Sequence, residues 1–232
     1  MNNDELKAVF DQQAPGYNKQ WARLAPINQG LYFLLESVFS ELPADARILC
    51  VGVGTGNELT YLAKRFPDWH FTAVEPSGAM LDECRKSTME EGLASRCYFH
   101  EGYLDSLPDV DMYHAATCFL VSQFMLDRNS RSHFFQQIAS RLAPDGILAS
   151  ADLAWDTNQD DYDNVLKLWQ SLMSMSDNSP ENLNRIKTMY AKDVAVLPPV
   201  KVASLIESSG FANAVQFYQA GLIHAWFATK TD

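Results

Sequence analysis

Three glycines follow an apolar run in the first quarter of the chain. The stretch ILCVGVGTGNE places Gly52, Gly54 and Gly56 where a buried strand should turn into a helix. A residue without Cβ lets the backbone turn sharply while a ligand lies against it. Such a turn also forms a ligand crevice at the carboxyl edge of a parallel sheet. We expect Gly52 and Gly54 to leave room for a ligand, and Gly56 to let the helix, capped by Asn57, pack close to the strand.

An acidic residue stands at the end of the next predicted strand. Glu75 follows the glycines by about twenty residues, a spacing at which a carboxylate can accept hydrogen bonds from the two hydroxyls of a ribose. A dinucleotide-binding motif needs its third glycine at position 57, which is Asn57 here. The pattern therefore favours a nucleoside ligand without a pyrophosphate over a nicotinamide dinucleotide.

Strands and helices alternate around these residues. The sequence predicts seven strands, at 47–53, 70–75, 97–102, 112–120, 147–155, 214–221 and 222–230. Intervening helical segments indicate right-handed βαβ units. We therefore expect an α/β fold with a doubly wound, Rossmann-like sheet that is mostly parallel. The last two strands should form a hairpin at Ala220-Gly221, with the last strand antiparallel.

The expected organisation is a single domain over residues 1–232. Residues 1–42 are predicted to form an N-terminal helical cap. Residues 155–198 break the alternation and are predicted to form a helical insertion over the ligand site.

Composition narrows the choice of partners. The net charge of −11, from 29 acidic and 18 basic side chains, repels nucleic acids and anionic membranes, so a small molecule is the expected substrate. No apolar run reaches membrane-spanning length, and the N-terminus lacks a signal-peptide pattern. The four cysteines lie far apart in the sequence, as is typical of free thiols in a reducing compartment, so we expect a cytoplasmic location. Neither they nor the five histidines show metal-ligand spacing, so we expect no metal. The sequence is also compatible with a homodimer.

The chain resembles the class I S-adenosylmethionine-dependent methyltransferases along nearly its whole length. ILCVGVGTG is similar to their first motif, VEPSGAML to their second, and HEGYLDSLP falls where they carry an adenine-edge motif. FDQQAPGYN resembles their helical opening, LAPDGILASADL their turn into the fifth strand, and QFYQAGLIHAWFATK their reversed hairpin. The resemblance implies S-adenosylmethionine as the cofactor.

The resemblance also implies roles for single residues. Gly52 and Gly54 would line the methionine part of the cofactor. Glu75, followed by Pro76, would bind the ribose, and Met80 would pack on the adenine face. The other cofactor contacts that it implies are Tyr103 and Leu104 at the adenine edge, Phe119 and Leu120 near the sulfonium, and Tyr17.

Two positions depart from the family pattern. Cys50 stands where these enzymes usually carry an acid, and Tyr103 where they usually carry an aspartate. A cysteine offers no carboxylate for the amino group of the cofactor, although Tyr103 could stack or donate a hydrogen bond. A buried Cys50 should be a poor nucleophile that only fills its strand position.

The sequence names no catalytic residue. A sulfonium methyl donor is already activated, so positioning and desolvation supply most of the acceleration. A general base is needed only for an acceptor such as a phenol or a hydroxyl. We expect substrate contacts from Trp21, Arg23, Gln123 and Trp169, although for Trp169 plain packing of the cap on the sheet is the slightly better explanation. His100 is the one histidine placed where it could act.

The favoured function is methyl transfer to a small molecule by in-line displacement. FLVSQFM and the final hairpin also resemble the carboxy-S-adenosylmethionine synthases, which serve tRNA modification. One alternative is therefore an enzyme like these synthases, or another tRNA-modification enzyme. The other, of a different class, is a non-catalytic S-adenosylmethionine-binding protein, which the changes at Cys50 and Tyr103 motivate.

Overall fold

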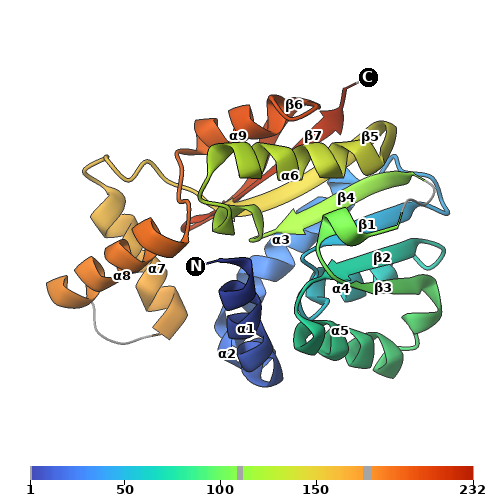
Figure 1. The fold of residues 1–232 in the computed structure, drawn as a ribbon, viewed down its shortest axis with the longest axis horizontal. Coiled ribbons are helices and arrows are strands. Elements are labelled where there is room, and N and C mark those ends of the chain that lie inside the picture. Colours follow the sequence, from blue (N-terminus) through green and yellow to red (C-terminus); the bar gives the residue numbers. More distant parts are fainter. Residues whose placement is uncertain (1, 109–111, 175–178, 232) are drawn as a thin grey trace.

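A seven-stranded sheet forms the centre of the protein (Figure 1). The computed structural model describes residues 2–108, 112–174 and 179–231. The strand order is β3-β2-β1-β4-β5-β7-β6. The strands are β1 (Arg47–Val51), β2 (His70–Glu75), β3 (Cys97–Glu101), β4 (Tyr113–Phe119), β5 (Leu142–Leu153), β6 (Phe211–Ala220) and β7 (Ile223–Lys230).

The pairing confirms the predicted α/β fold. Strands β1 to β5 pair in parallel, whereas β7 runs antiparallel to both β5 and β6. In β1 every residue after Arg47 is buried, as expected for a parallel strand with both faces covered. Strand β5 starts at Leu142, before the predicted residue 147, because its register against β4 shifts through a bulge that includes Asp145 at φ +60°.

Helices cover both faces of the sheet (Figure 1). Side chains of α3 (Ala25–Val38), α4 (Asn57–Arg65) and α5 (Gly78–Glu90) pack on one face, and those of α6 (Arg128–Arg141) and α9 (Pro199–Glu207) on the other. In the described ranges no helix is both long and apolar enough to cross a membrane. The short 3-10 turns among these elements are η3 (Ala94–Arg96), η4 (Leu104–Ser106) and η5 (Ser122–Phe124).

Helix α4 begins differently from the prediction. The N-cap is Gly56, at φ +80°, and Asn57 is the first helical residue, so the expected Asn57 cap is wrong by one position. A Cβ on Gly56 would lie 2.4 Å from Sγ of Cys84 on α5. Glycine is therefore needed here for its positive φ and for close contact with α5 rather than with the strand.

The remaining helices lie on the side toward which β4 points (Figure 1). They are α1 (Asn3–Gln13), η1 (Ala14–Gly16), α2 (Tyr17–Gln20), η2 (Ala22–Leu24), α7 (Tyr162–Ser174) and α8 (Pro180–Asp193). A third core joins Leu24 and Leu31 to Leu166 on α7, Leu183 on α8 and Ile223 on β7. The packing therefore ties the N-terminal helices to α7 and α8. The idea that residues 155–198 cover the ligand site stays a prediction.

Candidate functional site

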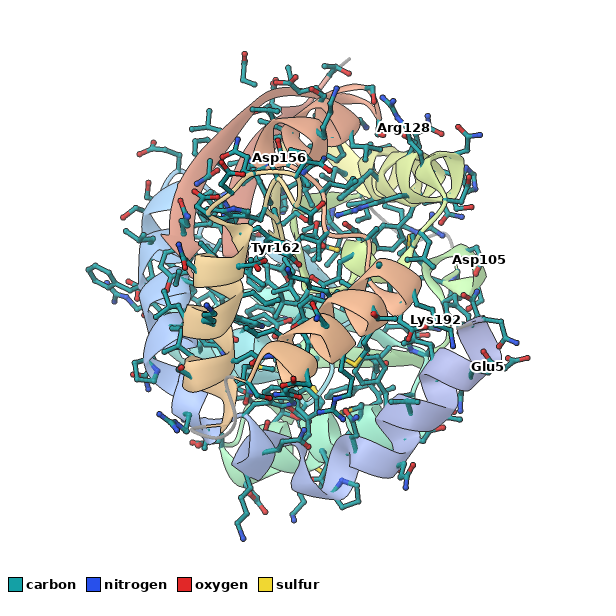
Figure 2. All side chains as sticks on the ribbon, turned by 90° about the vertical axis from the view of Figure 1, so that its left-hand side faces the viewer. Glu5, Asp105, Arg128, Asp156, Tyr162 and Lys192 are labelled. Atoms are coloured by element: carbon teal, nitrogen blue, oxygen red, sulfur yellow. The ribbon has the colours of Figure 1, made fainter. Side chains whose placement is uncertain are left out.

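A cavity of about 610 Å³ lies at the carboxyl ends of β1, β2 and β4. Its walls come from the glycine turn, the ends of β2 and β4, the N-terminal helices and the start of α6. Figure 2 looks onto this side of the molecule, where α1 carries Glu5, α8 carries Lys192, and Asp105 follows β3. All ten residues predicted as cofactor contacts line the cavity: Tyr17, Gly52, Gly54, Glu75, Pro76, Met80, Tyr103, Leu104, Phe119 and Leu120.

The carboxylate of Glu75 is held in place by backbone groups. Its Oε2 accepts a 3.0 Å hydrogen bond from Gly54 N, and its Oε1 accepts a 2.9 Å bond from Ser77 N. Burial raises the pKa of Glu75, and these two bonds partly oppose that effect. A carboxylate has about four acceptor sites, so two remain for a ligand. The side chain is therefore an oriented acceptor at the cavity wall.

The glycine turn contributes empty space at one position only. A Cβ on Gly54, at φ +54°, would meet nothing within 4 Å, and this residue lines the cavity. A Cβ on Gly52 would instead lie 2.4 Å from Cγ2 of Val121. Gly54 thus leaves room beside Glu75, whereas Gly52 makes room for a neighbouring side chain.

Apolar residues also line the cavity. Met80 and Leu104 are buried and line the cavity. Leu120, just after β4, adopts φ +60°, and its N–H donates a 2.6 Å hydrogen bond to the carbonyl of Ala151. A leucine in this left-handed region is strained, and such strain gathers at functional sites. Tyr103 is 39% exposed, and its hydroxyl donates to the carbonyl of Asn3 on α1.

The N-terminal helices close the cavity through polar contacts with distant segments. Asn18 Oδ1 accepts hydrogen bonds from Thr55 Oγ1 at 2.7 Å and from Asn57 Nδ2 at 3.1 Å. Asp11 Oδ1 accepts a 2.6 Å bond from Ser77 Oγ, at the N-cap of α5. These bonds hold one side of the site in place, because α1 and α2 supply five residues of the cavity wall: Asn3, Leu6, Lys7, Phe10 and Tyr17.

The four predicted substrate residues do not line the cavity. The ring of Trp21 contacts that of Tyr17 edge-on at 6.1 Å, and Arg23 is exposed. Trp169 is buried, and its Nε1 donates to the hydroxyl of Tyr190 at 2.9 Å. Their assignment to the substrate stays a prediction that the cavity geometry does not support.

The fourth of these residues, Gln123, belongs to a buried polar network. Asp152 accepts hydrogen bonds from Ser122 Oγ at 2.7 Å and from Gln123 N at 2.9 Å. It also forms a 3.0 Å ion pair with Arg131, which donates to the carbonyl of Ala195. Both charged side chains are almost fully buried. The network therefore fixes the turn after β4, the start of α6 and the segment after α8 to one another.

A buried acid at the cavity was missed in the sequence. Glu58, in the first turn of α4, is 8% exposed and lines the cavity. Burial raises its pKa to about 8. Hydrogen bonds with the backbone of Glu58 and Leu59 oppose this rise, and the nearby charge of Glu75 adds to it. The signal was present, since Glu58 lies four residues before Leu62 and so on the buried face of the helix.

None of the four cysteines lines the cavity, and His133 is the one histidine of the described residues in its wall. All four cysteines are free, and burial raises the pKa of the Cys50 thiol well above its usual range. His100 Nε2 lies 2.9 Å from Ser106 Oγ and outside the cavity wall. His224 is buried, which lowers its pKa to about 4. Within the described ranges, no group of three or more His, Cys, Asp or Glu side chains could hold a metal ion.

Comparison with protein families identifies this arrangement. Residues 48–146, from β1 into the turn of β5, match the family model of the methyltransferase domain. Residues 48–146 therefore form a methyltransferase domain, as the resemblance to the class I S-adenosylmethionine-dependent methyltransferases predicts. A search of curated protein sequences found no match for this methyltransferase domain.

Solved structures show the same fold. A candidate O-methyltransferase from Nostoc punctiforme PCC 73102 is 15% identical, with 96% of this chain and 60% of that chain covered and a TM-score of 0.70. An O-methyltransferase family 2 protein from Planctomyces limnophilus, in complex with apigenin, is 14% identical, with 100% and 62% covered and a TM-score of 0.64. Mitomycin 7-O-methyltransferase MmcR is 17% identical, with 96% and 60% covered and a TM-score of 0.63. The chain thus spans about 60% of the length of these proteins.

Proposed function

We propose that this protein is an S-adenosylmethionine-dependent methyltransferase that acts on a small molecule. The observation that carries the proposal is the placement of Glu75. Its carboxylate is fixed by Gly54 N and Ser77 N at the wall of a cavity, with acceptor sites left over. Vicinal ribose hydroxyls are the donors that such a carboxylate binds in nucleoside sites.

The residues present fit this cofactor. The open space at Gly54 admits a ligand beside Glu75, which a Cβ would fill. Met80 and Leu104 offer an apolar surface for adenine. The methionine part would lie against Gly54, which follows β1, and against Phe119 and Leu120 at the end of β4. When bound, the cofactor supplies a methyl group already activated on a sulfonium.

The protein then binds and orients the cofactor and the acceptor, and it excludes water from them. Glu75 fixes the ribose, and the bonds of Asp11 and Asn18 hold α1 and α2 over the cavity. Holding the acceptor in line with the methyl group and away from water supplies most of the acceleration in such a transfer. No protein group has to take a proton unless the acceptor is a hydroxyl or a phenol.

A small acceptor is favoured by charge and by the neighbours. The net charge of −11 opposes binding of nucleic acid. Two of the proteins with this fold are a mitomycin 7-O-methyltransferase and a protein solved with apigenin. The cavity of about 610 Å³ is in the size range of small-molecule sites.

Thermal unfolding tests the cofactor directly. Wild type is measured with S-adenosylmethionine, S-adenosylhomocysteine or NAD, each at about a hundred times the dissociation constant expected for a cofactor. Ligand at that excess stabilises the fold by about 2.7 kcal/mol. We expect the two adenosyl-sulfur ligands to raise the Tm and NAD to leave it unchanged. A shift with NAD alone, or with none of the three, would contradict the proposal.

A variant ties the effect to the site. Glu75→Ala should weaken S-adenosylmethionine binding by about 2–4 kcal/mol, because two hydrogen bonds to a charged acceptor are lost. Glu101→Ala, which removes an exposed carboxylate from the neighbouring strand β3 outside the cavity, is the matched control. Equal dissociation constants for wild type and Glu75→Ala would remove Glu75 from the ribose site.

Methyl transfer is the second stage of the test. Protein that binds the cofactor is incubated with methyl-labelled S-adenosylmethionine and a panel of phenols, alcohols, amines and small acids. We expect label in at least one product. Tight binding without transfer to any acceptor would favour a non-catalytic binding protein.

A further inference from the structure

Glu58 lines the cavity, and its carboxyl group has no cationic partner among the described residues. The side chain is 8% exposed and lies in the cavity wall. Within the part of the chain that the structure describes, no ion pair includes it. A buried carboxylate is unfavourable unless a cation or a proton neutralises it. Glu58 is therefore ready to accept a positive charge from a ligand.

The surroundings of Glu58 suit an organic cation. Tyr17 on α2 and Tyr32 on α3 line the cavity, and both lie close enough for the charge of Glu58 to add to the rise that burial causes in the pKa of their phenols. The ring of Tyr32 stacks with that of Phe119 at 6.3 Å. Aromatic faces together with a carboxylate are a common means of binding ammonium groups.

The order of the strands places Glu58 at one end of the ligand. Tyr103 follows β3, Glu75 ends β2, and Glu58 lies in the helix after β1, while the sheet runs β3-β2-β1. A ribose at Glu75 would therefore extend on one side toward β3 and on the other toward β1. The cofactor has adenine on one side of its ribose and an amino acid on the other. Since the apolar Met80 and Leu104 favour adenine, the amino acid falls on the side of Glu58.

Few basic side chains line the cavity. They are Lys7 and His133, and Lys7 forms an ion pair with Asp11 at 2.8 Å. Four acidic residues line the cavity: Glu58, Glu75, Asp105 and Asp127. We propose that Glu58 is the counter-ion of the cofactor's ammonium group, with Tyr17 and Tyr32 beside it. This inference rests on the proposed function.

Proton release supplies one readout. Burial raises the pKa of Glu58 to about 8, so near pH 7 the free protein holds a proton there, which an arriving cation displaces. The other titratable groups that face it are Glu75 on β2, Cys50 on β1, Cys84 on α5, and the two tyrosines. Glu58→Gln removes only the titration of Glu58, so its difference from wild type isolates that group.

Calorimetry at pH 7 tests the assignment with three ligands. S-adenosylmethionine carries an ammonium and a sulfonium, S-adenosylhomocysteine only the ammonium, and 5′-methylthioadenosine neither. In Glu58→Gln we expect the first two to bind at least about tenfold more weakly and the third to bind as in wild type. Titrations of Glu58→Gln in two buffers, phosphate and Tris, should show that ligand binding releases fewer protons than it does in wild type. Asp68→Asn, an exposed charge change outside the cavity, should match wild type throughout.

The outcomes separate the two proposals. Weaker binding of S-adenosylmethionine alone would place the sulfonium at Glu58 and overturn the ammonium assignment. Unchanged binding of all three ligands by Glu58→Gln, with an intact melting transition, would overturn any role of Glu58 in binding. Wild type that binds none of the three would overturn the proposed function, and this inference with it.

Discussion

Ser77 Oγ donates a 2.6 Å hydrogen bond to Asp11 Oδ1, although 66 residues separate the two in the chain. Ser77 also donates its backbone N–H to Glu75 and accepts from Met80 N as the N-cap of α5. One serine therefore connects the N-terminal helix to the glutamate and the methionine at the wall of the cavity.

Breaking this connection should loosen the N-terminal helices. Asp11→Ala removes the acceptor of the buried Ser77 hydroxyl and the partner of Lys7, which is partly exposed like Asp11 itself, so we expect about 1 kcal/mol less stability. Hydrogen exchange of residues 3–20 should become faster, and S-adenosylmethionine should bind more weakly, because α1 lines the cavity. Asp82→Ala, which removes a carboxylate that is 74% exposed and paired with Arg85, should change neither. Equal exchange in wild type and Asp11→Ala would show that the bond does not hold the helix.

Two glycines allow backbone strain to be separated from loss of space. Gly54 and Gly92 both have positive φ, and a Cβ on either would meet nothing within 4 Å, but only Gly54 lines the cavity. Gly54→Ala and Gly92→Ala should each lower the free energy of unfolding by about 1–2 kcal/mol. Gly54→Ala alone should also weaken cofactor binding, by at least about tenfold. Urea unfolding and calorimetry check the pair, and equal affinities would place the ligand elsewhere.

The buried ion pair between Arg131 and Asp152 gives a stability prediction. Arg131→Met leaves the carboxylate of Asp152 buried without its cation and should cost about 3–5 kcal/mol. Adding Asp152→Asn should recover part of this loss, because the uncompensated charge is gone. Arg85→Met, from the exposed pair with Asp82, should cost less than about 1 kcal/mol. Urea unfolding of the single and double variants measures the coupling free energy between Arg131 and Asp152. Strictly additive losses of stability would show that the two residues are not coupled.

The raised pKa of Glu58 predicts how stability depends on pH. An acid whose pKa is about 8 in the folded protein and about 4.5 in the unfolded chain binds more protons when folded, so its contribution is lost as pH rises through that window. Burial lowers the pKa of His224 to about 4, so this residue binds fewer protons when the protein is folded. Its effect on stability is therefore opposite, a gain as pH rises, but only below about pH 6.5. Wild type without ligand should therefore lose Tm between pH 6.5 and 8, and Glu58→Gln should lose less. Parallel Tm curves for the two proteins would show that Glu58 titrates normally.

The sequence was sufficient for the fold and for the gathering of the predicted cofactor residues. Apolar strands that alternate with helices force a parallel sheet, and residues at the ends of β1, β2 and β4 must then meet at one edge. Gly54 and Glu75 were predictable for this reason, since each belongs to a short local pattern.

The rest depends on contacts between distant segments. Nothing local marks Asp11 as the partner of Ser77. Trp169 and Gln123 illustrate a second limit, because apolar packing and a substrate pocket call for the same residue types. The start of α4 shows a third, since Asn57 is a good N-cap by type, but the positive φ of Gly56 moves the cap back by one residue.

The position of β7 has a consequence for synthesis. It lies between β5 and β6, and within the described sheet β6 pairs with no other strand. While the chain is being made, β5 and β6 leave the ribosome before the strand that must join them. The apolar edge of β5 stays open in that interval, and open edges of this kind are where nascent chains associate. Slow translation through the codons for residues 221–230 should therefore increase aggregation of newly made chains.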